Sequence, residues 1–129
     1  MVACSGMRVL VIDDSLTLRS LLRLHLSRMP DREVVFAENG QDAIQCIRDQ
    51  GSPDLILLDI NMPVMNGLEF LKLRESRGIS MSIPVILVTT EAKDEDVQRG
   101  LTAGAKGYLR KPFTAQDLES AIARALGDS

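Results

Sequence analysis

The sequence predicts an α/β fold in which a five-stranded parallel sheet is covered by helices on both sides. Short apolar segments alternate five times with segments whose apolar residues recur at helical spacing, which is typical of such a sheet. The segment DLILLD (54–59) is apolar on both faces, as expected of a central strand. The chain has 129 residues, 45% hydrophobic and 26% charged, which suits one globular domain and is too short for two of ordinary size.

The predicted strands are short and rich in aliphatic residues. In order, they are MRVLVI (7–12), VVFAE (34–38), DLILLD (54–59), PVILVT (84–89) and GYLR (107–110). A helix is predicted after each strand, at about residues 16–28, 40–48, 67–76, 94–103 and 114–126.

Local signals support these boundaries in chain order. Pro30 ends the leucine-rich first helix, because proline cannot continue a helix. Asn39-Gly40 can form a hairpin turn, but the residues after it have helical spacing, so we expect it to open the second helix. Gly51-Ser52-Pro53 breaks the chain before the third strand, and Pro84 starts the fourth. The last helix should bury one face, made of Leu118, Ala121, Ile122, Ala125 and Leu126.

The bulk properties exclude several classes of protein. No apolar run approaches the roughly eighteen residues needed to span a bilayer, and MVACSGM lacks the features of a secretory signal. The formal net charge of -3, without a basic block, argues against nucleic-acid binding. Cys4 and Cys46 give no disulfide framework or metal cluster. We therefore expect a cytoplasmic monomer with a short N-terminal extension (1–6), one folded domain (7–127) and no output domain.

Polar side chains gather at the ends of the predicted strands. In an open parallel sheet, ligands bind beyond the carboxyl ends of the strands. The polar residues at the ends of the first, third, fourth and fifth strands are Asp13, Asp14, Asp59, Thr89, Thr90, Arg110 and Lys111. If these four strands are neighbours, the side chains converge on a single pocket.

The acidic residues of this pocket suggest a metal-assisted reaction. Asp13 and Asp14 are adjacent like charges at the end of a buried strand, and they repel each other unless a cation relieves them. Asp14 and Asp59 could share Mg²⁺, or Mn²⁺, since such ions are typically held by one or two carboxylates and phosphate oxygens. With Lys111 and a hydroxyl opposite, the set suits phosphoryl transfer, with Asp59 as the nucleophile that becomes an aspartyl phosphate.

Four segments also carry a family resemblance. VLVIDDS, LILLDINMPVMNGLEFL, PVILVTTEAK and GAKGYLRKPFT resemble the signature segments of response-regulator receiver domains, and the resemblance runs over residues 7–126. NMPVMNGLE, TEAK and KPFTA are most similar to the single-domain, CheY-like members. The resemblance is specific because separated motifs occur in the right order on the right elements. It implies a flavodoxin-like, doubly wound (βα)5 fold with strand order 2-1-3-4-5.

The resemblance implies a signalling switch in a two-component phosphorelay, without turnover of a separate substrate. Asp59 resembles the phosphoacceptor, which takes its phosphoryl group from a phosphohistidine on a sensor histidine kinase or histidine phosphotransferase. Asp14 resembles the direct Mg²⁺ ligand and Asp13 its acidic partner. Asn61 is positioned to offer its backbone carbonyl to the metal.

The remaining implied roles concern switching and the lifetime of the phosphoryl group. Thr89 resembles the switch hydroxyl, Lys111 the cation on a phosphoryl oxygen, and Tyr108 the aromatic residue that moves inward when Thr89 moves. Asn61 and Glu91 resemble the positions that tune access of the hydrolytic water. The surface of the fourth helix, fifth strand and last helix would then bind an unknown downstream target, with chemotaxis as one pathway that the resemblance suggests.

Two features depart from the family pattern. Thr90 stands where a small alanine or glycine is usual, so it would crowd the phosphoryl pocket. AKDEDVQ (92–98) makes the start of the fourth helix acidic, which puts recognition of a flagellar motor target through that face in question.

Simpler interpretations exist for each site residue. Asp13 and Asp14 could cap a helix, Lys111 could be a surface lysine, Thr89 an ordinary strand residue and Tyr108 a packing residue.

Three other functions also fit parts of the sequence. A haloacid-dehalogenase-like phosphatase also forms an aspartyl phosphate, but it needs an acid where this chain has Asn61. A flavodoxin-like nucleotide binder shares the topology, but its first loop accepts phosphate through hydroxyls and glycines, whereas the acids of DDS would repel it. The third is an adaptor that keeps the fold without being phosphorylated.

Overall fold

The computed structural model describes residues 7–13, 19–20, 23–24, 32–60, 67–78, 82–89, 94–111 and 113–127, except the side chains of Arg32, Thr89, Asp94 and Asp96. Its elements are β1 (Met7–Ile12), β2 (Arg32–Ala37), α2 (Gly40–Gln50), β3 (Leu55–Asp59), α3 (Gly67–Arg77), β4 (Val85–Thr89), α4 (Asp94–Thr102), β5 (Gly107–Arg110) and α5 (Ala115–Gly127). Arg19–Ser20 and Arg23–Leu24 have helical backbone; the other residues of the predicted first helix lie outside the described part.

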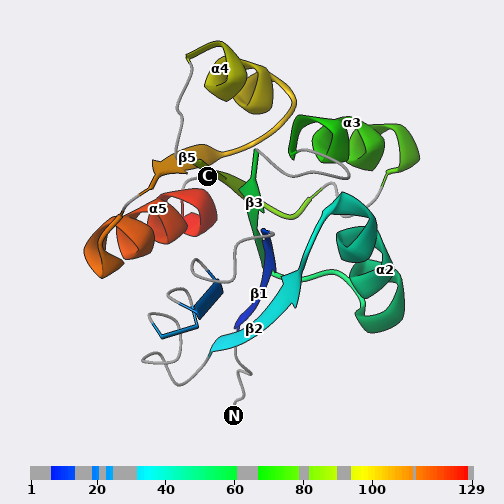
Figure 1. The fold of residues 1–129 in the computed structure, drawn as a ribbon, viewed down its shortest axis with the longest axis horizontal. Helices are drawn as coiled ribbons and strands as arrows, with labels where there is room; N and C mark the ends of the chain where they lie inside the picture. Colours follow the sequence, from blue (N-terminus) through cyan, green and yellow to red (C-terminus); the bar gives the residue numbers. More distant parts are fainter. Residues whose placement is uncertain are drawn as a thin grey trace.

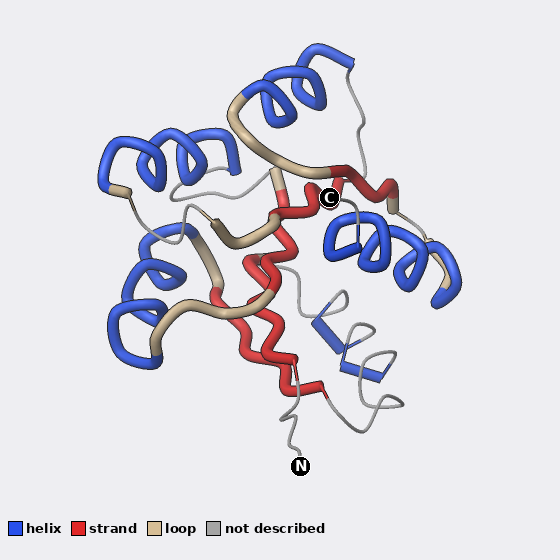
Figure 2. The backbone as a smooth tube through the Cα atoms, turned by 180° about the vertical axis from the view of Figure 1, so that it is seen from behind, coloured by secondary structure: helices blue, strands red, loops and turns tan. Residues whose placement is uncertain are grey.

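The strands form one parallel sheet in the order β2-β1-β3-β4-β5, which confirms the predicted fold. Figure 1 shows α2 and α3 on one side of the sheet and α5 on the other, and Figure 2 shows the same arrangement from behind. The strand order reverses at β1, because the chain runs outward from β1 to β2 and then returns to β3. The carboxyl ends of β1 and β3 therefore lie side by side at the point where such folds bind their ligands.

Successive strand residues enter two different cores. Side chains alternate across a sheet, so Leu10, Ile12, Ile56 and Leu58 pack on the side of α2 and α3. The residues between them pack on the side of α5, and the strand and helix residues of this second core are Val9, Val11, Leu55, Leu57, Ile86, Val88, Leu109, Leu118, Ile122 and Ala125. Every residue of β3 is buried, as predicted for a central strand.

One predicted core residue is on the surface. Leu118, Ile122 and Ala125 of α5 are buried and Ala121 is partly buried, but Leu126 is 47% exposed. The prediction for Leu126 was wrong, because Ala125 takes the buried place in the last turn and the next residue lies about 100° further around the helix.

The element boundaries follow backbone hydrogen bonds. β2 begins two residues earlier than predicted, because Arg32 already pairs with Met7. α2 begins after Asn39, whose side chain accepts a hydrogen bond from the backbone of Asp42 at 2.9 Å, so the Asn-Gly pair opens a helix as predicted. α2 ends at Gln50 and is capped by Gly51, whose φ of 87° suits a residue without a side chain.

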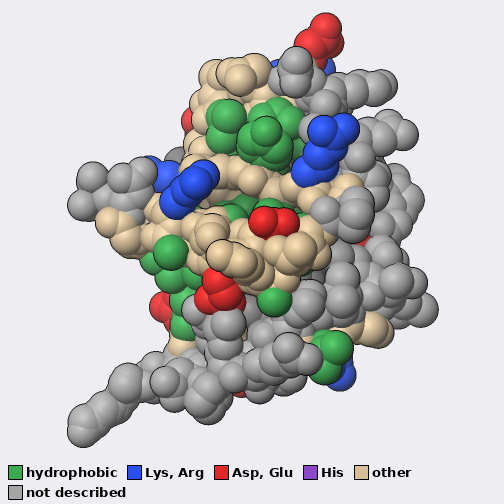
Figure 3. All heavy atoms as spheres, turned by 90° about the vertical axis from the view of Figure 1, so that its left-hand side faces the viewer, with side chains coloured by type: hydrophobic (Ala, Val, Ile, Leu, Met, Phe, Trp, Pro, Cys, Tyr) green, Lys and Arg blue, Asp and Glu red, His purple; other side chains and the backbone are tan. Residues whose placement is uncertain are grey.

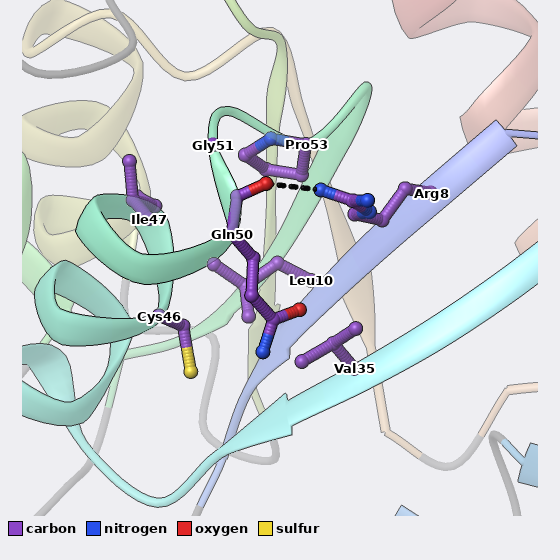
Figure 4. A pocket seen from close by; sticks show the side chains of 8 residues that line it. All are labelled: Arg8, Leu10, Val35, Cys46, Ile47, Gln50, Gly51 and Pro53. Atoms are coloured by element: carbon purple, nitrogen blue, oxygen red, sulfur yellow. Dashed lines mark hydrogen bonds between the residues drawn. The ribbon is translucent and has the colours of Figure 1, made fainter.

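Arg8 ties together the amino-terminal edge of the sheet. Its guanidinium donates to the backbone oxygen of Gln50 at 2.7 Å and to Glu33 at 3.2 Å, while its backbone N–H donates to Asp54 at 2.8 Å. Figure 4 shows the contact with Gln50 beside a hollow between α2 and the sheet. That hollow measures only ≈ 10 Å³, about the space of one water, so it is not a ligand site.

Candidate functional site

Two of the predicted acids lie at the carboxyl ends of neighbouring strands. Asp13 follows β1 directly, and its backbone N–H donates to the backbone oxygen of Ala37 at 3.0 Å. Asp59 is the last residue of β3, the strand next to β1. Lys111 follows β5 and reaches across the same edge of the sheet. The structure therefore brings together three of the predicted site residues, which lie up to 98 positions apart in the sequence.

A single ammonium group joins these two carboxylates. The Lys111 Nζ atom lies 3.0 Å from Asp13 Oδ2 and 3.6 Å from Asp59 Oδ2. All three side chains are largely buried, with exposed fractions of 14% for Lys111, 2% for Asp13 and 7% for Asp59. Burying charges costs free energy unless they are paired, so the lysine helps to hold both acids here. Of the two contacts, the one with Asp13 is the shorter.

Gly67 fixes the backbone around Asp59. A Cβ atom at this position would lie 2.6 Å from the backbone oxygen of Asp59 and 2.9 Å from Cα of Ile60, closer than real side chains come. The N–H of Gly67 also donates to the backbone oxygen of Ile60 at 2.9 Å. The first turn of α3 is therefore pressed against the end of β3, which only glycine permits. No local pattern in the sequence indicated this role, because the contact joins two separate elements of the fold.

The predicted switch residues lie on the two strands beside this site. Thr89 ends β4 and pairs with Arg110 of β5, so its backbone is at the same edge of the sheet; its side chain lies outside the described part. Tyr108 is 49% exposed and lines a groove of ≈ 520 Å³ between β5 and α5, together with Arg110 and Arg124. Figure 3 looks onto this side of the molecule and shows basic side chains on both sides of an acidic one, with a hydrophobic patch above them.

Several predicted site residues lie outside the described part of the chain. These are Asp14, Asn61, Thr90 and Glu91.

The described donor atoms fit a hard divalent cation. Asp13 and Asp59 offer carboxylate oxygens at one buried edge, and Mg²⁺ is typically held by one or two carboxylates together with waters and phosphate oxygens. Within the described ranges, no three His, Cys, Asp or Glu side chains converge, so a cage made wholly of protein side chains is not found there.

Comparison with known proteins identifies the family. The sequence matches the response regulator receiver domain over residues 9–123. The chain belongs to this family. The receiver domain is 37% identical over 121 residues to chemotaxis protein CheY1 of Helicobacter pylori, covering 94% of this chain and 98% of that protein. It is 36% identical over 121 residues to the chemotaxis protein CheY homolog of Campylobacter jejuni, covering 94% of this chain and 93% of that protein.

Solved structures agree with the sequence match. Chemotaxis protein CheY4 of Vibrio cholerae has a TM-score of 0.86 and 34% identity, and the match covers 95% of this chain and all of that one. The protein is therefore a CheY-like receiver domain of two-component signalling. Because the chain belongs to this family, a receiver domain explains the fold better than a phosphatase or a nucleotide binder does. No helix in the described part of the receiver domain is long and apolar enough to cross a membrane.

Proposed function

We propose that this receiver domain is a phosphorylation switch that accepts a phosphoryl group on Asp59 from the phosphohistidine of a sensor histidine kinase or histidine phosphotransferase. The observation that carries the proposal is the shared lysine. Asp59 is a buried carboxylate with an ammonium group at 3.6 Å, which a phosphoryl oxygen can also approach. Phosphoryl transfer depends mainly on positioning and on neutralising charge, and this edge of the sheet supplies both.

The proposed step forms one bond and breaks one. An Oδ atom of Asp59 attacks phosphorus, the phosphorus–nitrogen bond of the phosphohistidine breaks, and the imidazole nitrogen keeps the electron pair. Lys111 then lies close enough to bind an oxygen of the new phosphoryl group, and Thr89 at the end of the neighbouring strand would offer its hydroxyl to another. Asp13 keeps the lysine in place through its 3.0 Å contact.

A divalent cation completes the proposed site. Asp13 and Asp59 would hold Mg²⁺ or Mn²⁺ with Asp14 and the backbone carbonyl of Asn61, and the bound ion would neutralise charge on the transferred oxygens. Asn61 and Glu91 would set the rate at which water removes the phosphoryl group.

The proposed output is a change of the surface formed by α4, β5 and α5. Phosphoryl contacts to Thr89 and Lys111 would stabilise a minor conformation in which Tyr108 leaves its exposed position. The altered surface would bind a downstream protein target. The chemotaxis proteins among its relatives favour a motility pathway, and the receiver domain would act as a monomer in the cytoplasm, without nucleic acid.

Intact-mass measurement tests the phosphoacceptor. The protein is incubated with acetyl phosphate and Mg²⁺, and the wild type is expected to gain one phosphoryl group that Asp59→Asn does not gain. Asp54→Asn is the matched control, since Asp54 is an exposed carboxylate at the opposite edge of the sheet, and it should be phosphorylated like the wild type. An adduct on Asp59→Asn, or none on the wild type, would reject the proposal; the second outcome would favour the unphosphorylated adaptor.

A further inference from the structure

Two arginines of the first helix share one aromatic ring on β2. Arg19 and Arg23 are four residues apart, and both have helical backbone. Their guanidinium carbons lie 6.0 Å and 5.1 Å from the centre of the Phe36 ring. Arg19, Ser20, Arg23 and Phe36 line a hollow of ≈ 350 Å³. The two positive charges are therefore held side by side at the edge of a concave surface.

Neither guanidinium has an acidic partner among the residues that the structure describes. Arg19 and Arg23 form no ion pair with an Asp or Glu side chain, and the Arg19 Nε atom is buried without a hydrogen-bond partner, as far as the described residues reach. Like charges one turn apart on a helix destabilise it, and a buried donor without an acceptor costs free energy as well. An anion in the hollow would neutralise the pair, and a shift of the Arg19 side chain on binding would let Nε donate to it.

This place is separate from the phosphorylation site. Phe36 lies on β2, the edge strand, whereas Asp59 ends β3, and β1 lies between these two strands. Lys111 follows β5, the outer strand on the other side of the sheet from β2. An anion beside Arg19 and Arg23 would therefore not compete with a phosphoryl group on Asp59.

We infer that Arg19, Arg23 and Ser20 form a binding site for a phosphoryl dianion. Two guanidinium groups match a charge of two, whereas a single carboxylate would leave one arginine uncompensated. The planar guanidinium forks can each donate two hydrogen bonds to a tetrahedral phosphate, and the Ser20 hydroxyl can supply a further donor. The hollow lies at the lower end of the volumes typical of small-molecule sites, so a small phosphate ester is the class of ligand that fits.

Arginine-detected NMR tests this site directly. The unphosphorylated protein in EDTA is titrated with inorganic phosphate at constant ionic strength, and the Arg19 Nε–H resonance is followed. We expect a saturable shift with a dissociation constant of about 1 mM, the strength that a few charge-assisted hydrogen bonds provide. Arg23→Gln should weaken binding at least about fivefold, and Arg19→Lys, which keeps the charge but loses the fork, should weaken it similarly.

Matched controls decide whether the binding is specific. Arg48 is an exposed arginine of α2 with no acidic partner in the described part of the chain, so Arg48→Gln removes the same charge and should leave phosphate binding unchanged. A shift that does not saturate, or equal weakening by Arg48→Gln, would mean that phosphate only screens the surface charge. Acetate binding as tightly as phosphate would overturn the assignment to a phosphoryl dianion.

Discussion

Replacing Lys111 by methionine should reveal how strongly one ammonium group holds two buried acids. The substitution keeps most of the apolar stem and removes the charge that lies 3.0 Å from Asp13 and 3.6 Å from Asp59. Removing one partner of a buried ion pair typically costs about 3–5 kcal/mol. Lys111 is 14% exposed, so water can still reach its place, and we expect the lower end of this range. The free energy of unfolding should fall by about 3 kcal/mol, which lowers the melting temperature of a domain of this size by roughly 10 °C.

A double-mutant cycle separates this electrostatic cost from lost packing. Both acid oxygens lie close to the same nitrogen, so they are no further apart than the sum of those two distances. Their mutual repulsion is therefore at least about 2.5 kcal/mol at an effective dielectric constant near 20. Adding Asp13→Asn to Lys111→Met removes one of the two carboxylate charges and this repulsion. The double variant should therefore recover at least about half of the lost stability.

Urea denaturation at pH 7 measures the cycle. Lys106→Met is the control, because Lys106 is an exposed lysine just before β5 and its loss should change the free energy of unfolding by less than about 0.5 kcal/mol. A cost below about 1 kcal/mol for Lys111→Met would refute the reasoning, because the pair would then behave like a surface salt bridge. So would a double variant no more stable than Lys111→Met alone.

Three further predictions follow from contacts elsewhere. Gly67→Ala should destabilise the fold by about 2 kcal/mol and slow phosphorylation, because its Cβ would lie 2.6 Å from the backbone oxygen of Asp59; an unchanged melting temperature and adduct rate would contradict this. Burial, and to a lesser extent the charges of Asp42 and Asp49, raises the pKa of the Cys46 thiol. Iodoacetamide should therefore modify Cys46 slowly at pH 8 and faster in Asp49→Asn, and equal rates of modification would contradict this. The hydroxyl of Thr114 caps α5, because it accepts a hydrogen bond from the backbone of Asp117 at 3.0 Å. Thr114→Ala should therefore lower the free energy of unfolding in urea by about 1 kcal/mol, and an unchanged value would contradict the cap.

The raised pKa of Cys46 also predicts how stability depends on pH. The folded protein keeps the thiol proton at a pH where the unfolded chain has lost it, so the unfolded state binds fewer protons there. This contribution to stability is complete below the ordinary thiol pKa and is lost as pH rises through the folded value. Cys46→Ala should therefore show a smaller loss of stability than the wild type above about pH 9.

The fold could be predicted because its information is local. Each strand is a short apolar run, each helix has its own period, and the alternation of the two allows few arrangements. The convergence of Asp13, Asp59 and Lys111 was predictable for the same reason, since residues that end neighbouring parallel strands meet at one edge.

Other features depend on three-dimensional contacts that no local pattern records. Arginine is usually exposed in folded proteins, yet Arg74 is only 2% exposed. Its guanidinium donates to the backbone oxygen of Ile83 at 3.0 Å. Burial lowers the pKa of its guanidinium. The preference of Lys111 for Asp13 over Asp59 likewise depends on differences of less than one ångström, which motif spacing cannot convey.

The two cores on either side of the sheet change how substitutions should be compared. Leu57 and Leu58 are joined by a peptide bond, but their side chains lie in separate cores with the backbone of β3 between them. Leu58 shares a core with Ile44 and Phe70, which are distant in sequence. Two strand residues in this receiver domain should therefore be energetically coupled when their side chains lie on the same face of the sheet, whatever their distance along the chain. Substitutions at adjacent core positions should have independent effects on stability.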